Sequence, residues 1–142
     1  MSDKKYIETL KKELENWSKS TKYPYIHHIM LLPDIVKTLS ILYKSELVKN
    51  DNKTKNKIRH ALDYIESGFD LISEELVGPR GYIDDAFISA HILIDIKNQD
   101  KELETVISSL IDTEKLQSII NDAEKMLENK IYSMALRIIK TV

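Results

Sequence analysis

Apolar residues recur along this chain at intervals of three and four positions, which is the period of an α-helix with one buried face. The clearest stripe steps through Ile58, Leu62, Ile65, Phe69 and Ile72. No segment alternates apolar and polar residues with the period of two that marks a half-buried strand. The pattern therefore predicts an all-α protein.

The stripes and the breaks between them predict the extent of each helix. The expected ranges are about 3–19, 33–48, 58–72, 82–98, 100–111 and 112–140, with a short helix or turn over 25–32. Pro33 suits the start of its helix, where a missing N–H leaves no hydrogen bond unmade. Asp112 is expected to cap the last helix. We predict one domain, residues 1–142, folded as a compact bundle of five or six helices.

The segment 82–98 differs from the others because it is apolar on most of its circumference. Ile83, Phe87 and Ile94 fall on one side, and Ile88 and Ile96 fall on another. A helix that is apolar nearly all round must be covered on all sides. We therefore expect this helix at the centre of the bundle.

Composition and charge narrow the classes of function. The chain is 42% apolar and 31% charged, as in a globular protein. It has no cysteine, which excludes disulfides, thiolate metal sites and a cysteine nucleophile. The formal net charge of −2 argues against a dedicated nucleic-acid binder. The basic cluster Lys49, Lys53, Lys55, Lys57 and Arg59 is interpreted as a solvated loop and helix start, with phosphate contact as the alternative.

Hydropathy predicts where the protein resides. No apolar run reaches the roughly 20 residues that a membrane-spanning helix needs. The charged N-terminal segment has no apolar signal core. We therefore expect a cytoplasmic protein without a membrane span.

Two short motifs resemble a known family. The segment Phe69-Asp70-Leu71-Ile72-Ser73 is followed, after a short loop, by Gly81-Tyr82-Ile83-Asp84-Asp85 and an apolar helix. Over residues 58–95 this arrangement resembles the YkvA-like family, a bacterial domain of unknown function, although Ser73 stands where the family has proline. The resemblance implies a helical fold and no assigned chemistry. It makes the following motif residues candidates for binding: Asp70, Gly81, Asp84 and Asp85.

The acidic residues of these motifs have a structural and a functional interpretation. In the first turn of a helix, Asp84 and Asp85 would be stabilised by the helix dipole, by about 0.3–1 kcal/mol each. Alternatively, Asp84, His91 and Asp95 share one helix face at spacings of seven and four residues. With Asp70 from the preceding helix, they would suit a divalent metal such as manganese, iron or zinc. Both interpretations stay open.

Two of the four histidines, His27 and His28, are adjacent. On a helix they would point away from each other, one at the margin of the core and the other to solvent. The sequence assigns a role to neither.

Three functions remain as hypotheses, because the chain has neither a glycine-rich phosphate loop nor a nucleophile elbow. The first is a small helical interaction module that acts through a protein partner, with the first helix as docking element and a homodimer as the simplest form. The second is an inhibitor or immunity-type protein, in which the acidic stretch 95–128 blocks a basic enzyme. The third is a metal-dependent enzyme that uses the residues Asp70, Asp84, His91 and Asp95. We favour the first, which needs no catalytic residue.

Overall fold

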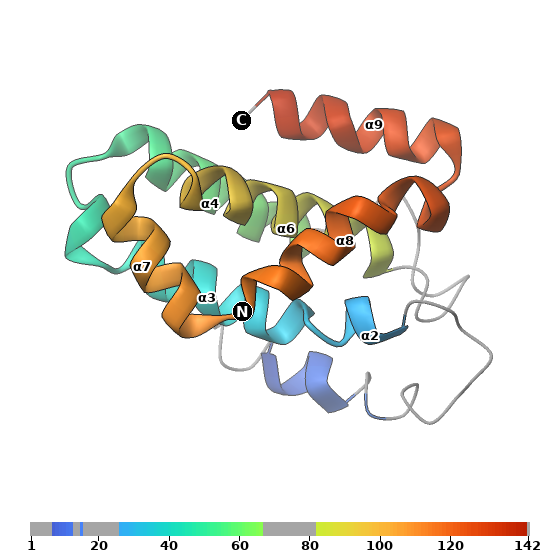
Figure 1. Cartoon of the computed structure of the whole chain (residues 1–142), viewed down its shortest axis with the longest axis horizontal. Coiled ribbons are helices and arrows are strands. Elements are labelled where there is room, and N and C mark those ends of the chain that lie inside the picture. Colours follow the sequence, from blue (N-terminus) through green and yellow to red (C-terminus); the bar gives the residue numbers. More distant parts are fainter. Residues whose placement is uncertain (1–6, 13–14, 16–25, 67–81, 142) are drawn as a thin grey trace.

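The computed structural model describes residues 7–12, 15, 26–66 and 82–141. In these ranges seven α-helices and one 3₁₀-helix pack together and no strand occurs, which confirms the all-α prediction (Figure 1). The elements are α2 (Ile26–Ile29), α3 (Leu32–Tyr43), η1 (Glu46–Val48), α4 (Asn52–Glu66), α6 (Ile83–Lys97), α7 (Lys101–Leu110), α8 (Thr113–Met126) and α9 (Asn129–Lys140). Residues 7–12 are helical as well. The expected number of five or six helices is therefore too small.

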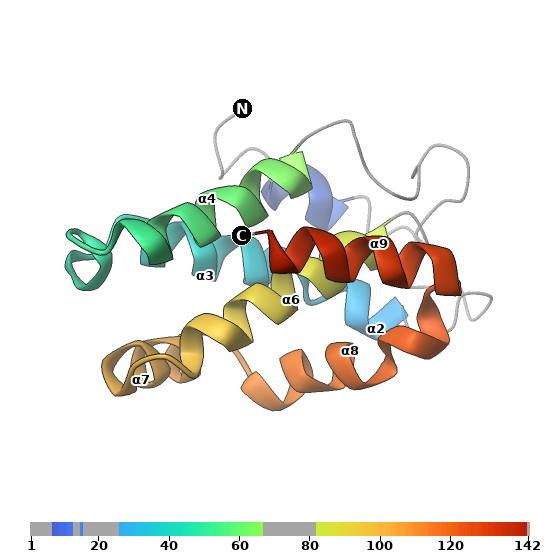
Figure 2. The same cartoon turned by 90° about the horizontal axis from the view of Figure 1, so that it is seen from above.

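The helix α6 forms the centre of the bundle, as predicted. It contacts α2, α3, α4, α7, α8 and α9. Figure 2 shows α3 and α4 on one side of it, and α7 and α8 on the other. Twelve of its 15 residues are buried, and full burial of a side chain such as Leu93 stabilises the fold by about 1.5–3 kcal/mol. The apolar circumference of α6 thus supplies the surface on which the other helices pack.

Aspartate side chains determine where several helices begin. Asp112 Oδ1 accepts hydrogen bonds from the backbone N–H groups of Glu114 and Lys115 at 3.0 and 3.3 Å. This confirms the predicted cap. Asp100 caps α7 in the same manner, and Asp51 accepts a backbone hydrogen bond in the first turn of α4. These bonds satisfy N–H groups that have no partner within the helix.

The single helix predicted over 112–140 is two helices. The backbone becomes extended at the buried Leu127, with φ −109° and ψ 141°, and α9 begins at Asn129. A straight helix over that range would be roughly 40 Å long and would run past the core. The break instead turns α9 back along the bundle, so that both α8 and α9 contact α6 (Figure 1).

The helices expected over 33–48 and 3–19 can also be compared with the observed boundaries. The helix expected over 33–48 starts with Pro33 in its first turn but ends at Tyr43. Ser45 then accepts a hydrogen bond from the backbone N–H of Leu47 at 3.1 Å and starts η1. Serine competes for backbone donors in this way and so favours caps over helix interiors. The helix expected over 3–19 is helical at residues 7–12 and 15, and the rest of that range lies outside the described residues.

Candidate functional site

The acidic motif lies at the start of α6. Asp84 and Asp85 occupy the first turn, as predicted, and both side chains are completely buried. The hydroxyl of Tyr64 on α4 donates a hydrogen bond to Oδ2 of Asp84 at 2.7 Å. A buried carboxylate needs such partners because its transfer out of water is unfavourable. Asp70 and Gly81, the other two motif residues, lie outside the described residues.

The predicted metal ligands on α6 are only partly brought together. His91 Nδ1 lies 3.3 Å from Oδ2 of Asp95, and these side chains are 28% and 45% exposed. Asp84 is buried and bonded to Tyr64 instead. In the described part of the chain, no three His, Cys, Asp or Glu side chains are close enough to hold a metal ion. A divalent metal at a site that includes Asp70 stays a prediction.

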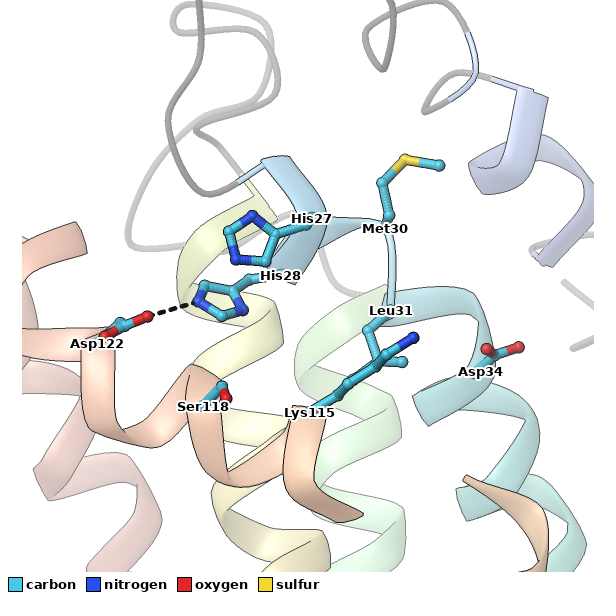
Figure 3. A pocket seen from close by; sticks show the side chains of 8 residues that line it. All are labelled: His27, His28, Met30, Leu31, Asp34, Lys115, Ser118 and Asp122. Carbon is cyan, nitrogen blue, oxygen red and sulfur yellow. Dashed lines mark hydrogen bonds and ion pairs between the residues drawn. The ribbon is translucent and has the colours of Figure 1, made fainter. Parts of the chain in front are cut away.

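A pocket of about 310 Å³ lies where α2 meets α8 and the start of α3 (Figure 3). The polar residues that line it come from α2 (His27, His28), α3 (Asp34) and one face of α8 (Lys115, Ser118, Asp122). The pattern of residues along the sequence does not predict this site. His28 and Asp122 are 94 residues apart, and no local pattern indicates that they meet.

The central contact of this pocket joins His28 to Asp122. Nε2 of His28 lies 2.8 Å from Oδ2 of Asp122, and the histidine is only 4% exposed. A carboxylate without a proton only accepts hydrogen bonds, so this geometry places a hydrogen on Nε2. The pair links α2 to α8 and fixes the orientation of the Asp122 carboxylate.

The neighbouring His27 faces the same pocket. Its ring centroid lies 4.1 Å from that of His28, so the expectation that the two rings point away from each other is wrong. The helix α2 is a single turn, and both rings are turned toward the pocket (Figure 3). Burial and the nearby His28 lower the pKa of His27, and Asp122 opposes this shift. His27 therefore favours its neutral form at neutral pH.

A second depression, of about 450 Å³, lies between residues 7–12 and α3. We call it the N-terminal groove, and its lining comprises Ile7, Glu8, Lys11, Lys37, Ser40, Ile41 and Lys44. Ile41 is 40% exposed and is one of the few large apolar side chains of the described residues that face solvent to this extent. Leu10 is buried in the core and anchors the N-terminal wall. The predicted docking helix thus contributes one side of a groove on its own chain.

Two residues of the predicted basic cluster, Lys55 and Arg59, contact Tyr43. Arg59 Nη2 donates a hydrogen bond to the Tyr43 hydroxyl at 2.7 Å, and Lys55 Nζ lies 5.4 Å from the ring centroid. The hydrogen bond from Arg59 lowers the pKa of Tyr43 and raises that of Arg59. Lys49 forms an ion pair with Glu46 at 3.7 Å. These contacts favour the interpretation of the cluster as an ordinary solvated surface.

Comparison with known proteins provides no relative from which a function could be transferred. No family model, no curated protein and no solved structure matches this chain. The resemblance to the YkvA-like family over residues 58–95 stays a prediction. No helix among the described residues is long and apolar enough to cross a bilayer.

Proposed function

We propose that the protein is a small helical interaction module that binds an acidic, amphipathic helix of a partner protein in the N-terminal groove. The observation that carries this proposal is the composition of the groove, in which apolar Ile7 and Ile41 are accompanied by Lys11, Lys37 and Lys44. Apolar side chains of a partner helix would bury against the isoleucines, and acidic side chains at its margins would face the lysines.

The spacing along α3 supports a helical partner. Lys37, Ile41 and Lys44 are exposed and follow one another at four and three positions, so they form one stripe about 10 Å long. A partner helix that places an apolar residue over Ile41 would have acidic positions one turn away on either side. Glu8 is the one acidic side chain among the described residues of the lining, and so the groove favours a partner of negative charge.

The other hypotheses have less support in the described residues. Several carboxylates of the acidic stretch 95–128 already serve the fold, since Asp100 and Asp112 cap helices and Asp122 binds His28. These three carboxylates have roles within the fold, so their presence alone is no evidence for an acidic face that blocks a basic enzyme. A metal-dependent enzyme would need a set of ligands, and no such set occurs in the described ranges. A homodimer would be the same module with a second copy as its partner.

The test is a titration of the full-length, ¹⁵N-labelled protein followed by NMR. The probe is a synthetic amphipathic helix with leucines on one face and glutamates at its margins, and the control probe carries lysines in place of the glutamates. We expect the acidic probe to shift the amide signals of residues 7–12 and 37–44, and added salt to weaken the binding. Lys37→Glu should weaken it roughly tenfold, or by about 1.4 kcal/mol. Lys125→Glu, which reverses an exposed charge on α8, should leave it unchanged.

Three outcomes would contradict the proposal. The first is equal binding of both probes, and the second is a response outside the groove. The third is binding to vesicles of anionic lipid without binding to the acidic probe, which would identify a membrane surface as the ligand. Native mass spectrometry completes the test, because a dimer that dissociates on Ile41→Glu would identify a second copy as the partner.

A further inference from the structure

We propose that the pocket between α2 and α8 binds a small organic amine in its protonated form. This site shares none of its described lining residues with the N-terminal groove, and the proposal does not rest on the function proposed above. Its volume of about 310 Å³ lies at the lower end of the range of ligand pockets, which indicates a small molecule.

The anchor for the ammonium group is the carboxylate of Asp122. The buried His28 holds one of its oxygens at 2.8 Å, and a third of the Asp122 side chain remains exposed. Ser118 lies one turn earlier on the same face of α8, and Figure 3 shows it beside Asp122 on the pocket side. A protonated primary amine has three N–H donors, and these two side chains offer acceptors for them. Since His28 fixes the carboxylate in advance, binding loses little side-chain freedom there.

The walls suit the apolar part of such a ligand. The rings of His27 and His28 lie 4.1 Å apart at one wall, and Leu31 and Met30 form another (Figure 3). Met30 is 36% exposed, and its flexible thioether adapts to ligands of different shape. Because burial lowers the pKa of His27, its ring favours the neutral form and does not repel a cation.

The distribution of charge decides between an amine and an anion. Two carboxylates and one ammonium line the pocket, so acidic side chains outnumber lysines there. Lys115 lies two helical turns from Asp122, and Figure 3 shows its side chain extending toward Asp34. Lys115 therefore extends away from Asp122 and leaves this carboxylate for the ligand. A carboxylate or phosphate ligand would instead be repelled by both Asp34 and Asp122.

The proposal is tested with n-butylammonium as the probe and butyrate as its counterpart of opposite charge. Isothermal titration calorimetry and NMR on the full-length protein at pH 7.5 should show that n-butylammonium binds and shifts the signals of His27, Ser118 and Asp122. Butyrate should not bind. Binding of butyrate in preference, or an absence of binding by n-butylammonium, would overturn the proposal.

Variants assign the binding to Asp122. Asp122→Asn should weaken the binding of n-butylammonium at least tenfold, whereas Glu124→Gln, an exposed carboxylate on the same helix, should not change it. Since Asp122→Asn also changes the partner of a buried histidine, a second variant leaves that contact intact. Lys115→Gln removes an exposed positive charge and should tighten the binding about threefold. Weaker binding by Lys115→Gln, or unchanged binding by a folded Asp122→Asn protein, would overturn the proposal.

Discussion

The hydroxyl of Tyr64 on α4 donates a hydrogen bond to the buried carboxylate of Asp84 in the first turn of α6, with an O–O distance of 2.7 Å. This contact ties α4 to the start of α6, where the acidic residues of the motif lie. Tyr64→Phe removes the donor and keeps the ring. We expect it to lower the free energy of unfolding by about 1–3 kcal/mol, because a buried carboxylate loses one of its hydrogen bonds. Urea denaturation followed by circular dichroism measures this difference.

A control substitution on α9 measures the effect of removing a tyrosine hydroxyl that makes no hydrogen bond to another described residue. Tyr132 is half-buried, and its hydroxyl makes no hydrogen bond to another described residue. Tyr132→Phe should therefore change the free energy of unfolding by less than about 0.5 kcal/mol. If the two variants lost equal stability, the bond between Tyr64 and Asp84 would contribute nothing of its own.

The cap of α7 supplies a second prediction. Asp100 accepts hydrogen bonds from the backbone N–H groups of Glu102 and Leu103 at 2.6 and 3.3 Å. Asp100→Ala should lower the free energy of unfolding by about 1 kcal/mol, whereas Asp100→Asn keeps an acceptor and should lose little. Thermal unfolding of the two variants under the same conditions compares them. Equal losses would mean that charge near the helix dipole, rather than the cap itself, stabilises this helix.

The lowered pKa of His27 predicts how stability depends on pH. Burial is the largest cause of the shift from the ordinary value of 6.5, followed by the neighbouring His28, and Asp122 opposes both. The folded protein therefore binds this proton less tightly than the unfolded chain does, and protonation favours unfolding. We expect the free energy of unfolding to fall as the pH drops below 6.5 and through the lower pKa of the folded state.

In the variant His27→Gln, the free energy of unfolding should fall less between pH 7.5 and pH 5 than it does in the wild type. Urea midpoints at pH 7.5 and pH 5 should differ less in this variant than in the wild type, because glutamine does not titrate. The comparison at pH 7.5 serves as the reference for any direct effect of the substitution. If the pH dependence of the two proteins were the same, His27 would not contribute to it.

The contact of Arg59 with Tyr43 predicts that the Tyr43 hydroxyl loses its proton at a lower pH than an ordinary tyrosine. The hydrogen bond from Arg59 is the largest cause that lowers the pKa of Tyr43 from 10.0, and the charge of Lys55 is a smaller one. NMR titration with tyrosine labelled at Cζ measures this pKa. Arg59→Gln should raise it toward the ordinary value, and Lys55→Gln should raise it less. Equal effects would contradict the dominant role of the hydrogen bond.

Much of the fold could be predicted from the sequence, because the deciding signals are local. The apolar circumference of 82–98 required a central helix, and α6 has that position. Asp112 and Pro33 marked the starts of α8 and α3 because capping and proline geometry depend on neighbouring residues alone. The first turn of α6 was placed correctly as well, but its complete burial was not foreseen.

The features that the sequence did not reveal depend on packing between distant segments. The apolar stripe of the last helix continues through Leu127 without interruption, so only the need to cover α6 explains the break there. The contact of His28 with Asp122 likewise requires α2 and α8 to meet. The spacing of Asp84 and His91 put them on one helix face. Asp84, however, is buried and bonded to Tyr64 of α4, whereas His91 is partly exposed and contacts Phe87 of its own helix.

The position of α6 has a consequence for how the chain acquires its structure. Three of the α-helices in the described ranges precede α6 and three follow it, and each of the six contacts it. Neither group can bury its apolar face fully before α6 is present. We therefore expect α2, α3 and α4 to complete their packing during synthesis only once residue 97 has left the ribosome, and the two groups of helices to become stable in one cooperative step.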